Sequence, residues 1–219
     1  MPNGFDAATD GGRVENAGNI LFSHTTGAGS NRAIFVYARN TNGGSPSSVL
    51  YGGVTASLIG SMDNGAEHRH HMFVLANPAT GANNVIVGYA AQQGFIDAAA
   101  LTYTGVDQTT QVNANNPNST SASTSYSPSV VTGADNSWVV ACIGNSTGQA
   151  SAGGGTVLRF SNANGNAWGD NNSDVPTSGT VASVVATRPA NANWSGVTAA
   201  VSPAIAAVAG NDLTLLGVG

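Results

Sequence analysis

The chain has 219 residues, of which 8% are charged, and its formal net charge at pH 7 is −5. All six basic residues are arginine, and lysine is absent. Because nucleic acids and anionic lipids are bound by clusters of basic side chains, this composition argues against both kinds of partner. The length is sufficient for a sizeable core in one all-β domain.

The loops are rich in Asn, Ser, Thr and Gly, which is typical of proteins that function outside a cell. The N-terminus nevertheless lacks the cationic and apolar segments of a signal peptide. No stretch reaches the roughly 20 apolar residues that a membrane span requires. This combination is expected of a virion protein that is released by lysis, or of a piece that is exported with a larger assembly. The only cysteine, Cys142, lies in an apolar run and is expected to be a buried thiol.

The first half of the chain reads as a polar segment followed by short strands. Residues 1–18 are polar and rich in turn-forming residues, and we predict an N-terminal arm there, followed by a single domain at 19–219. Gly52 and Gly53 form a predicted two-residue hairpin turn. Runs of β-branched and aromatic residues, bounded by Gly, Pro and Asn, predict strands at 19–24, 32–38, 48–51, 54–61, 70–76, 85–89 and 96–104.

Short predicted strands also make up the second half of the chain, after a polar segment. Residues 108–125 predict a long loop that contacts another subunit, and residues 161–179 predict a second polar loop. No helical period and no repeat of fixed length is recognisable. The pattern predicts an all-β fold, an antiparallel two-sheet β-sandwich of jelly-roll type. The further predicted strands are 126–131, 137–143, 156–160, 180–186, 194–201 and 212–218.

A histidine-rich segment, residues 68–71, precedes one of these strands. Side chains alternate along a strand, so His68 and His70 share one face. Two imidazoles in this spacing are a candidate metal pair, although a closed site would require ligands from elsewhere or from symmetry-related chains. The alternative is a solvated beginning of a strand.

A second candidate metal site is the sequence Asp170-Asn171-Asn172-Ser173-Asp174. Oxygen-bearing side chains at Asp170, Asn172 and Asp174 have the spacing that suits Ca²⁺. The glycine and the later glutamate of an EF-hand loop are missing. The alternative is a polar connection between strands that is stabilised by Asx turns.

Two aromatic residues are candidate contacts for a glycan or a protein partner. Trp168 lies in the second predicted loop, and Tyr126 follows the first. An exposed aromatic ring can stack on a sugar or fill a pocket of a partner. The alternative is that Trp168 holds its own loop against the sandwich.

The sequence contains no recognisable catalytic motif. It has only two glutamates, and ionisable groups are sparse throughout. With few charges available to shift a pKa, we do not expect an enzyme.

Four segments carry a resemblance to a known group of domains. They contain a Tyr-Gly-Gly-Val hairpin at 51–54, an Asn-Pro-x-x-Gly turn at 77–81 and a Gly-Val-Asp-Gln turn at 105–108, with a further match at 194–203. Together they resemble a β-sandwich domain that recurs in tailed-phage virion structural proteins and in bacterial extracellular proteins. The resemblance spans residues 20–205. It implies a β-sandwich fold and a virion or extracellular setting, and it provides no catalytic residues that could be assigned to positions of this chain.

These observations predict a phage virion structural protein. A capsid decoration or cement protein ranks ahead of a tail or fibre subunit, because the chain is small. We expect a homo-oligomer, a trimer, that contacts the major capsid or another virion protein. The alternative is a non-catalytic carbohydrate-binding module.

Overall fold

The computed structural model describes residues 3–41, 44–64, 68–146 and 148–205, and all regular elements in them are β-strands. The expectation of an all-β antiparallel sandwich is confirmed. The strands are β1 Gly4–Thr26, β2 Ala33–Asn40, β3 Ser48–Tyr51, β4 Val54–Thr55, β5 Ser57–Asp63, β6 Arg69–Ala76, β7 Gly81–Thr104, β8 Val112–Tyr126, β9 Ser129–Val131, β10 Trp138–Asn145, β11 Ser151–Ala152, β12 Val157–Ser161, β13 Asn166–Asp170, β14 Val181–Ser183 and β15 Ala186–Val201.

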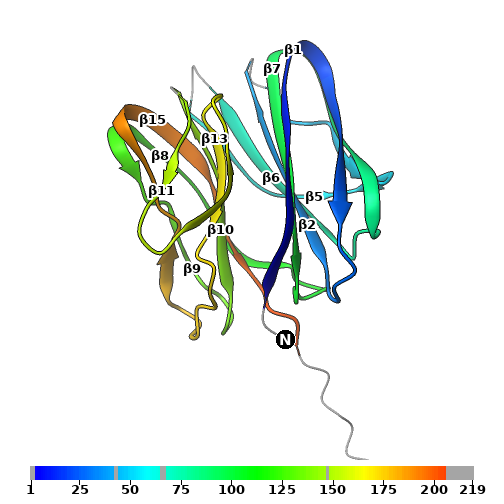
Figure 1. The fold of residues 1–219 in the computed structure, drawn as a ribbon, viewed down its shortest axis with the longest axis vertical. Helices are drawn as coiled ribbons and strands as arrows, with labels where there is room; N and C mark the ends of the chain where they lie inside the picture. The colour runs from blue at the N-terminus through cyan, green and yellow to red at the C-terminus, as the bar shows by residue number, and fades with distance from the viewer. Residues whose placement is uncertain (1–2, 42–43, 65–67, 147, 206–219) are drawn as a thin grey trace, which may run out of the picture.

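Strands β1–β7 form the first half of the molecule. They make one seven-stranded sheet in the order β4-β3-β7-β2-β6-β5, and β1 pairs with β7. Register shifts interrupt the long β1–β7 pair, and Figure 1 shows both strands turning over at one end of the molecule. The early part of β7 pairs with β3 and the late part pairs with β2. The sheet thus folds into two layers around its own core, which includes Ile34, Val85 and Ile96.

Strands β8–β15 form the second half. Six of them make a sheet in the order β11-β15-β10-β13-β12, with β8 paired to β15, and β9 and β14 form a separate ribbon. The β8–β15 pair is also long and has register shifts near its middle. A second enclosed core, with Trp194, Ile143 and Val130 among its members, lies inside this half.

The two halves have the same topology. The strand order β1-β7-β2-β6-β5 of the first half corresponds to β8-β15-β10-β13-β12 of the second. In addition, β3 and β11 pair with the early parts of β7 and β15. Residues 31–40 (NRAIFVYARN) correspond to residues 136–145 (NSWVVACIGN), and Asn31 and Asn136 both have positive φ, 52° and 57°. The structure therefore reveals an internal repeat that the sequence pattern does not show, because few side chains are identical.

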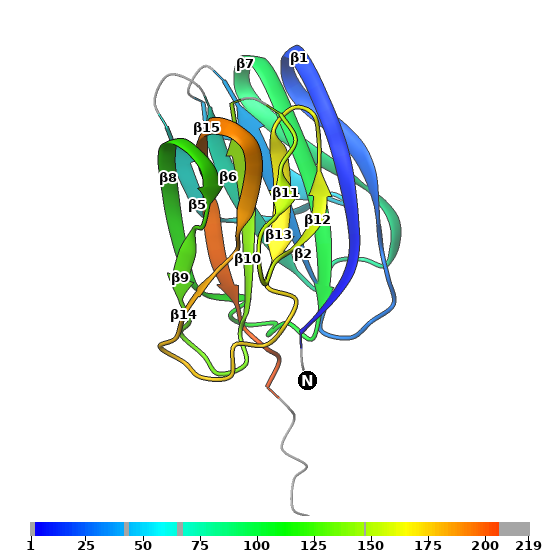
Figure 2. The ribbon, with the colours of Figure 1, turned by 60° about the vertical axis from the view of Figure 1, so that its left-hand side comes forward.

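The halves pack against each other through equivalent faces. They lie side by side in Figure 1, and in Figure 2 the second half has come forward in front of the first. The core between them contains Phe35 of β2 and its counterpart Val140 of β10. It also contains Leu101 of β7 and its counterpart Ala199 of β15. One chain thus resembles a dimer with an approximate two-fold relation between its halves.

Two polar segments that were predicted to lie outside the sheets belong to edge strands. The prediction of an arm at residues 1–18 is wrong for residues 4–17, which pair with β7. The prediction of a loop at residues 108–125 is wrong from Val112 onward, because β8 pairs with β15. Each of these strands is paired on one side and leaves many polar side chains at the surface, so its composition resembles that of a loop.

The second predicted loop, residues 161–179, also contains a strand. Its residues 166–170 form β13, which lies between β10 and β12 and is buried. The predicted hairpin turn at Gly52 and Gly53 is confirmed, with φ of 56° and 84° between the paired strands β3 and β4. The predicted strand at 212–218 lies outside the described residues.

Close packing between the halves depends on Gly144 of β10. A Cβ atom at this position would overlap the buried imidazole of His70 in β6. We predict that Gly144→Ala lowers the free energy of unfolding by about 2 kcal/mol, because overpacking forces neighbouring groups apart. Urea unfolding followed by tryptophan fluorescence measures this change. The control is Gly154→Ala, where no atom lies within 4 Å of the added Cβ and little change is expected. Equal effects of the two substitutions would contradict the prediction.

Candidate functional site

A buried polar cluster lies where the first half meets the second; we call it the polar junction and define it by Tyr37, Arg39, His70, Asn145 and Asn166. Arg39 Nη1 donates to Asn166 Oδ1 at 2.8 Å, and its Nη2 donates to the Asn145 carbonyl at 3.3 Å. The Tyr37 hydroxyl donates to the same Asn166 Oδ1 at 3.0 Å. Side chains of the first half therefore satisfy carbonyl groups of the second, which fixes how the two sheets meet.

A pair of charges stands next to the polar junction. Arg13 binds the Asp97 carboxylate with two hydrogen bonds of 2.8 Å, and Arg39 Nη1 lies 3.8 Å from Asp97 Oδ2. The Arg13 guanidinium lies over the Phe95 ring, 3.9 Å from its centroid. The buried carboxylate thus has two cationic neighbours, and its charge is compensated within the first half.

The structure places His70 inside the polar junction and His68 at its border. The His70 ring is buried and stacks on Tyr37, whose hydroxyl lies 3.0 Å from His70 Nδ1. Because this hydroxyl donates to Asn166, we assign the proton of the neutral imidazole to His70 Nδ1. His68 is half-buried, and its ring lies 5.4 Å from that of Phe95.

This arrangement does not support the predicted metal pair at His68 and His70. The two rings are 6.4 Å apart at 61°. A ligand enclosed between the halves, as His70 is, cannot reach an ion shared with another chain. Within the parts of the chain that the structure describes, no three or more His, Cys, Asp or Glu side chains gather to hold a metal ion.

Burial lowers the pKa of all four histidines. It lowers the pKa of His24 and of His71 to about 4, and that of His68 to about 3, with the nearby arginines adding to the effect at His68. The pKa of His70 also falls well below its usual value, through burial first and then the charge of Arg39. In the folded protein these imidazoles therefore remain neutral at pH values where an exposed histidine is protonated.

We predict that acid destabilises the fold between about pH 6.5 and pH 4. In this window the unfolded chain binds more protons than the folded chain, so the free energy of unfolding falls as pH falls. His71 is expected to contribute about 1 kcal/mol for each pH unit. Urea unfolding at a series of pH values measures the slope. The variant His71→Gln should show a shallower slope, and a profile parallel to that of the unchanged protein would refute the assignment.

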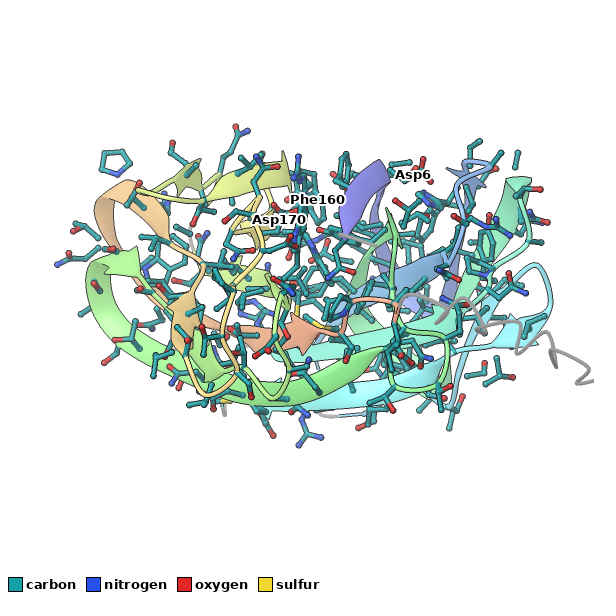
Figure 3. All side chains as sticks on the ribbon, turned by 90° about the horizontal axis from the view of Figure 1, so that it is seen from below. Asp6, Phe160 and Asp170 are labelled. Atoms are coloured by element: carbon teal, nitrogen blue, oxygen red, sulfur yellow. The ribbon has the colours of Figure 1, made fainter. Side chains whose placement is uncertain are left out.

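Asp170, the first of the predicted calcium ligands, instead forms a charged anchor between the halves. Its carboxylate accepts hydrogen bonds from Arg159 Nε at 2.6 Å and from Arg159 Nη2 at 2.9 Å. The Tyr103 hydroxyl of the first half donates to the same group at 2.8 Å. Figure 3 shows Asp170 beside Phe160 at the border between the halves, near the strand that carries Asp6.

The other two predicted calcium ligands also accept hydrogen bonds from side chains of the protein. Asn172 Oδ1 accepts from Arg159 Nη2 at 2.6 Å, and Asp174 Oδ1 accepts from Trp138 Nε1 at 2.7 Å. This arrangement does not support the predicted Ca²⁺ site at Asp170, Asn172 and Asp174, because the Arg159 guanidinium already supplies positive charge to Asp170 and Asn172.

We predict that Asp170→Asn lowers the free energy of unfolding by about 3 kcal/mol, because it leaves the mostly buried Arg159 guanidinium without its carboxylate. The matched control is Asp63→Asn, which removes an exposed pair with Arg69 and should cost less than about 1 kcal/mol. Chemical unfolding of both variants provides the comparison. An effect of Asp170→Asn as small as that of the control would show that the buried pair contributes little.

The two predicted aromatic contact residues are inside the protein. Trp168 is fully buried, and its Nε1 donates to the Tyr103 hydroxyl at 3.0 Å. Tyr126 stacks on Trp194 and donates its hydroxyl proton to the Asn118 carbonyl at 2.6 Å. The prediction that Trp168 and Tyr126 meet a glycan or a partner is wrong, because neither ring reaches the surface.

Cys142 is buried, as expected from its apolar run, and burial raises the pKa of its thiol to about 12.

The structure also shows a pocket that the sequence analysis missed. It has a volume of about 690 Å³, and carboxylates of Asp107, Asp135 and Asp174 line it together with Ile205. Asp107 accepts hydrogen bonds from Thr109 N and Thr110 N, both at 2.7 Å, and therefore caps its own turn. These aspartates come from three distant segments, so no local spacing signals the pocket.

Comparisons with protein families, with curated proteins and with solved structures find no match to this chain. Within the described residues, no helix is long and apolar enough to cross a membrane.

Proposed function

We propose that this protein is a structural protein of a phage particle and that it decorates the capsid through contacts with neighbouring subunits. The observation that carries the proposal is a surface formed by β8 and the β9–β14 ribbon, here called the β8 surface. Val131 and Val181 lie directly opposite each other in the ribbon and are 53% and 67% exposed. A groove next to them is lined by Ala114, Asn115, Asn116, Ser129 and Val130.

The chemistry of the β8 surface suits a contact between proteins. Residues 112–126 carry no charged side chain and are rich in Asn, Ser and Thr. Exposed apolar side chains beside uncharged hydrogen-bonding groups are the combination found in protein interfaces, whose centres are depleted in charge. Residues 108–125 are also the segment that the sequence analysis assigned to contact with another subunit.

Further support comes from the two buried carboxylates of Asp97 and Asp170. Both are bound to arginines of the same chain, so these carboxylates are already paired within the fold. This arrangement favours a structural role over a catalytic one. We propose that the protein acts as a homo-oligomer with the major capsid protein as partner, and that a capsid position ranks ahead of a tail or fibre position.

The proposal predicts that the protein remains with purified particles. Phage particles from the host that carries this coding sequence would be banded on a density gradient and analysed by mass spectrometry. Recombinant protein should also bind particles from which it is missing. Val181→Asp should weaken that binding at least tenfold, because it places an unpaired charge on the β8 surface.

Val157→Asp is the matched control, because Val157 is an exposed valine on β12, outside the β8 surface. Binding by this control should be unchanged. A protein that stays entirely in the soluble fraction of the lysate and binds no particle would contradict the proposed function.

A further inference from the structure

The internal repeat allows the loops around the starts of β2 and β10 to be compared residue by residue. Arg32 of the first half corresponds to Ser137 of the second in the alignment of the two halves. The Arg32 carbonyl accepts a hydrogen bond from Asn77 N at 2.8 Å, and the Ser137 carbonyl accepts one from Val175 N at 2.8 Å. The loop that contains Asn77 is therefore the counterpart of the loop that contains Val175.

In the first half, the Arg32 guanidinium bridges two loops. Its Nη1 donates to the Gly29 carbonyl at 2.5 Å, and its Nε donates to the Pro78 carbonyl at 3.3 Å. In the second half, the Ser137 hydroxyl donates to the Ala134 carbonyl at 2.7 Å, which is the counterpart of the Gly29 carbonyl. The short serine side chain donates to only one of the two loops, so it does not bridge them as Arg32 does.

The pocket of about 690 Å³ lies at these loops of the second half. Its lining includes Ala134 and Asp135 from one loop and Asp174 from the other, and Asp107 from the connection between the halves also lines it. A volume of this size suits a small ligand, or a side chain with its flanking backbone. The pocket thus borders the position that corresponds to the arginine of the first half.

The three carboxylates of the pocket have unused hydrogen-bonding capacity. Each accepts hydrogen bonds from the protein through Oδ1 only. Asp107 accepts them from its own turn, Asp135 accepts one from Ser178 N at 2.7 Å, and Asp174 accepts one from the Trp138 indole at 2.7 Å. Among the described residues, none of the three forms an ion pair with a basic side chain.

The spacing of these carboxylates favours an organic cation over a metal ion. In the described part of the chain they do not gather closely enough to hold one ion. A guanidinium group is larger, and it carries five N–H donors and a positive charge in a planar fork that matches carboxylate oxygens.

We propose that this pocket binds the guanidinium group of an arginine side chain that a partner protein presents. The methylene groups of that side chain contact the apolar wall formed by Pro203, Ala204 and Ile205, the last of which is 83% exposed. The proposal rests on the proposed function for its partner, because it names the chemistry of one contact between that partner and this chain.

Titration of the full chain with N-acetyl-arginine amide, followed by NMR, tests the site. This capped arginine should shift the backbone amide signals of Asp135 and Asp174, and its affinity should fall as salt is added. N-acetyl-citrulline amide has the same shape without the charge and should bind about tenfold more weakly. N-acetyl-lysine amide has the charge without the planar fork and should also bind more weakly than the capped arginine.

Two substitutions remove charge from the pocket with little change of shape. Asp135→Asn and Asp174→Asn should each weaken binding of the capped arginine about fivefold, because asparagine retains the Oδ1 acceptor and loses the charge. The matched control is Asp10→Asn, which removes the same charge at an exposed position of β1 outside the pocket and should leave the affinity unchanged. Thermal unfolding of each variant verifies the fold.

Three results would overturn the proposal. They are the absence of any shift at the pocket amides, an affinity for the citrulline or lysine derivative equal to that for the capped arginine, and an equal loss of affinity in Asp10→Asn and Asp135→Asn.

The assignment of the arginine to a partner has its own test. Asp135→Asn should weaken the association of the recombinant protein with particles. Unchanged association of a variant that no longer binds the capped arginine would overturn this assignment. A protein that binds no particle but does bind the capped arginine would contradict the proposed function and leave the pocket established, since the titration uses no particle.

Discussion

The packing of one half of the molecule against the other is the constraint on which the rest of the structure depends. Both sheets offer equivalent apolar faces to this contact, with Phe35 and Leu101 on one side and Val140 and Ala199 on the other. Because that face of each sheet is covered, the opposite face must be covered separately. The long pairs β1–β7 and β8–β15 achieve this by bending, so that each sheet encloses a second core.

Polar groups determine how the two faces align. Apolar contact alone allows sheets to slide, whereas a buried charge or amide must find its partner in one place. The polar junction around Arg39 and the Asp170–Arg159–Tyr103 anchor supply such contacts from both halves. We interpret them as groups that specify the arrangement, since buried ion pairs contribute little net stability compared with apolar residues of the same size.

This use of charge leaves the surface with an unusual chemistry. With only 8% charged residues, several of them buried in pairs, wide areas of sheet present only amide, hydroxyl and aliphatic groups. The β8 surface is such an area. Large uncharged faces lower the cost of removing water when proteins meet, which agrees with a role in assembly.

The sequence by itself determined the class of the fold and the positions of the apolar strands. Runs such as residues 32–38 and 137–143 are recognisable because a strand buried on both faces requires apolar residues at nearly every position. It could not determine the extent of β1 and β8, because an edge strand has the polar composition of a loop. It also could not place Trp168, Tyr126, Asp170 or His70, whose neighbours come from distant strands. Only the tertiary structure decided that these residues are buried. Each of their contacts depends on how the sheets fold and pack, and this packing cannot be deduced from the spacing of residues along the chain.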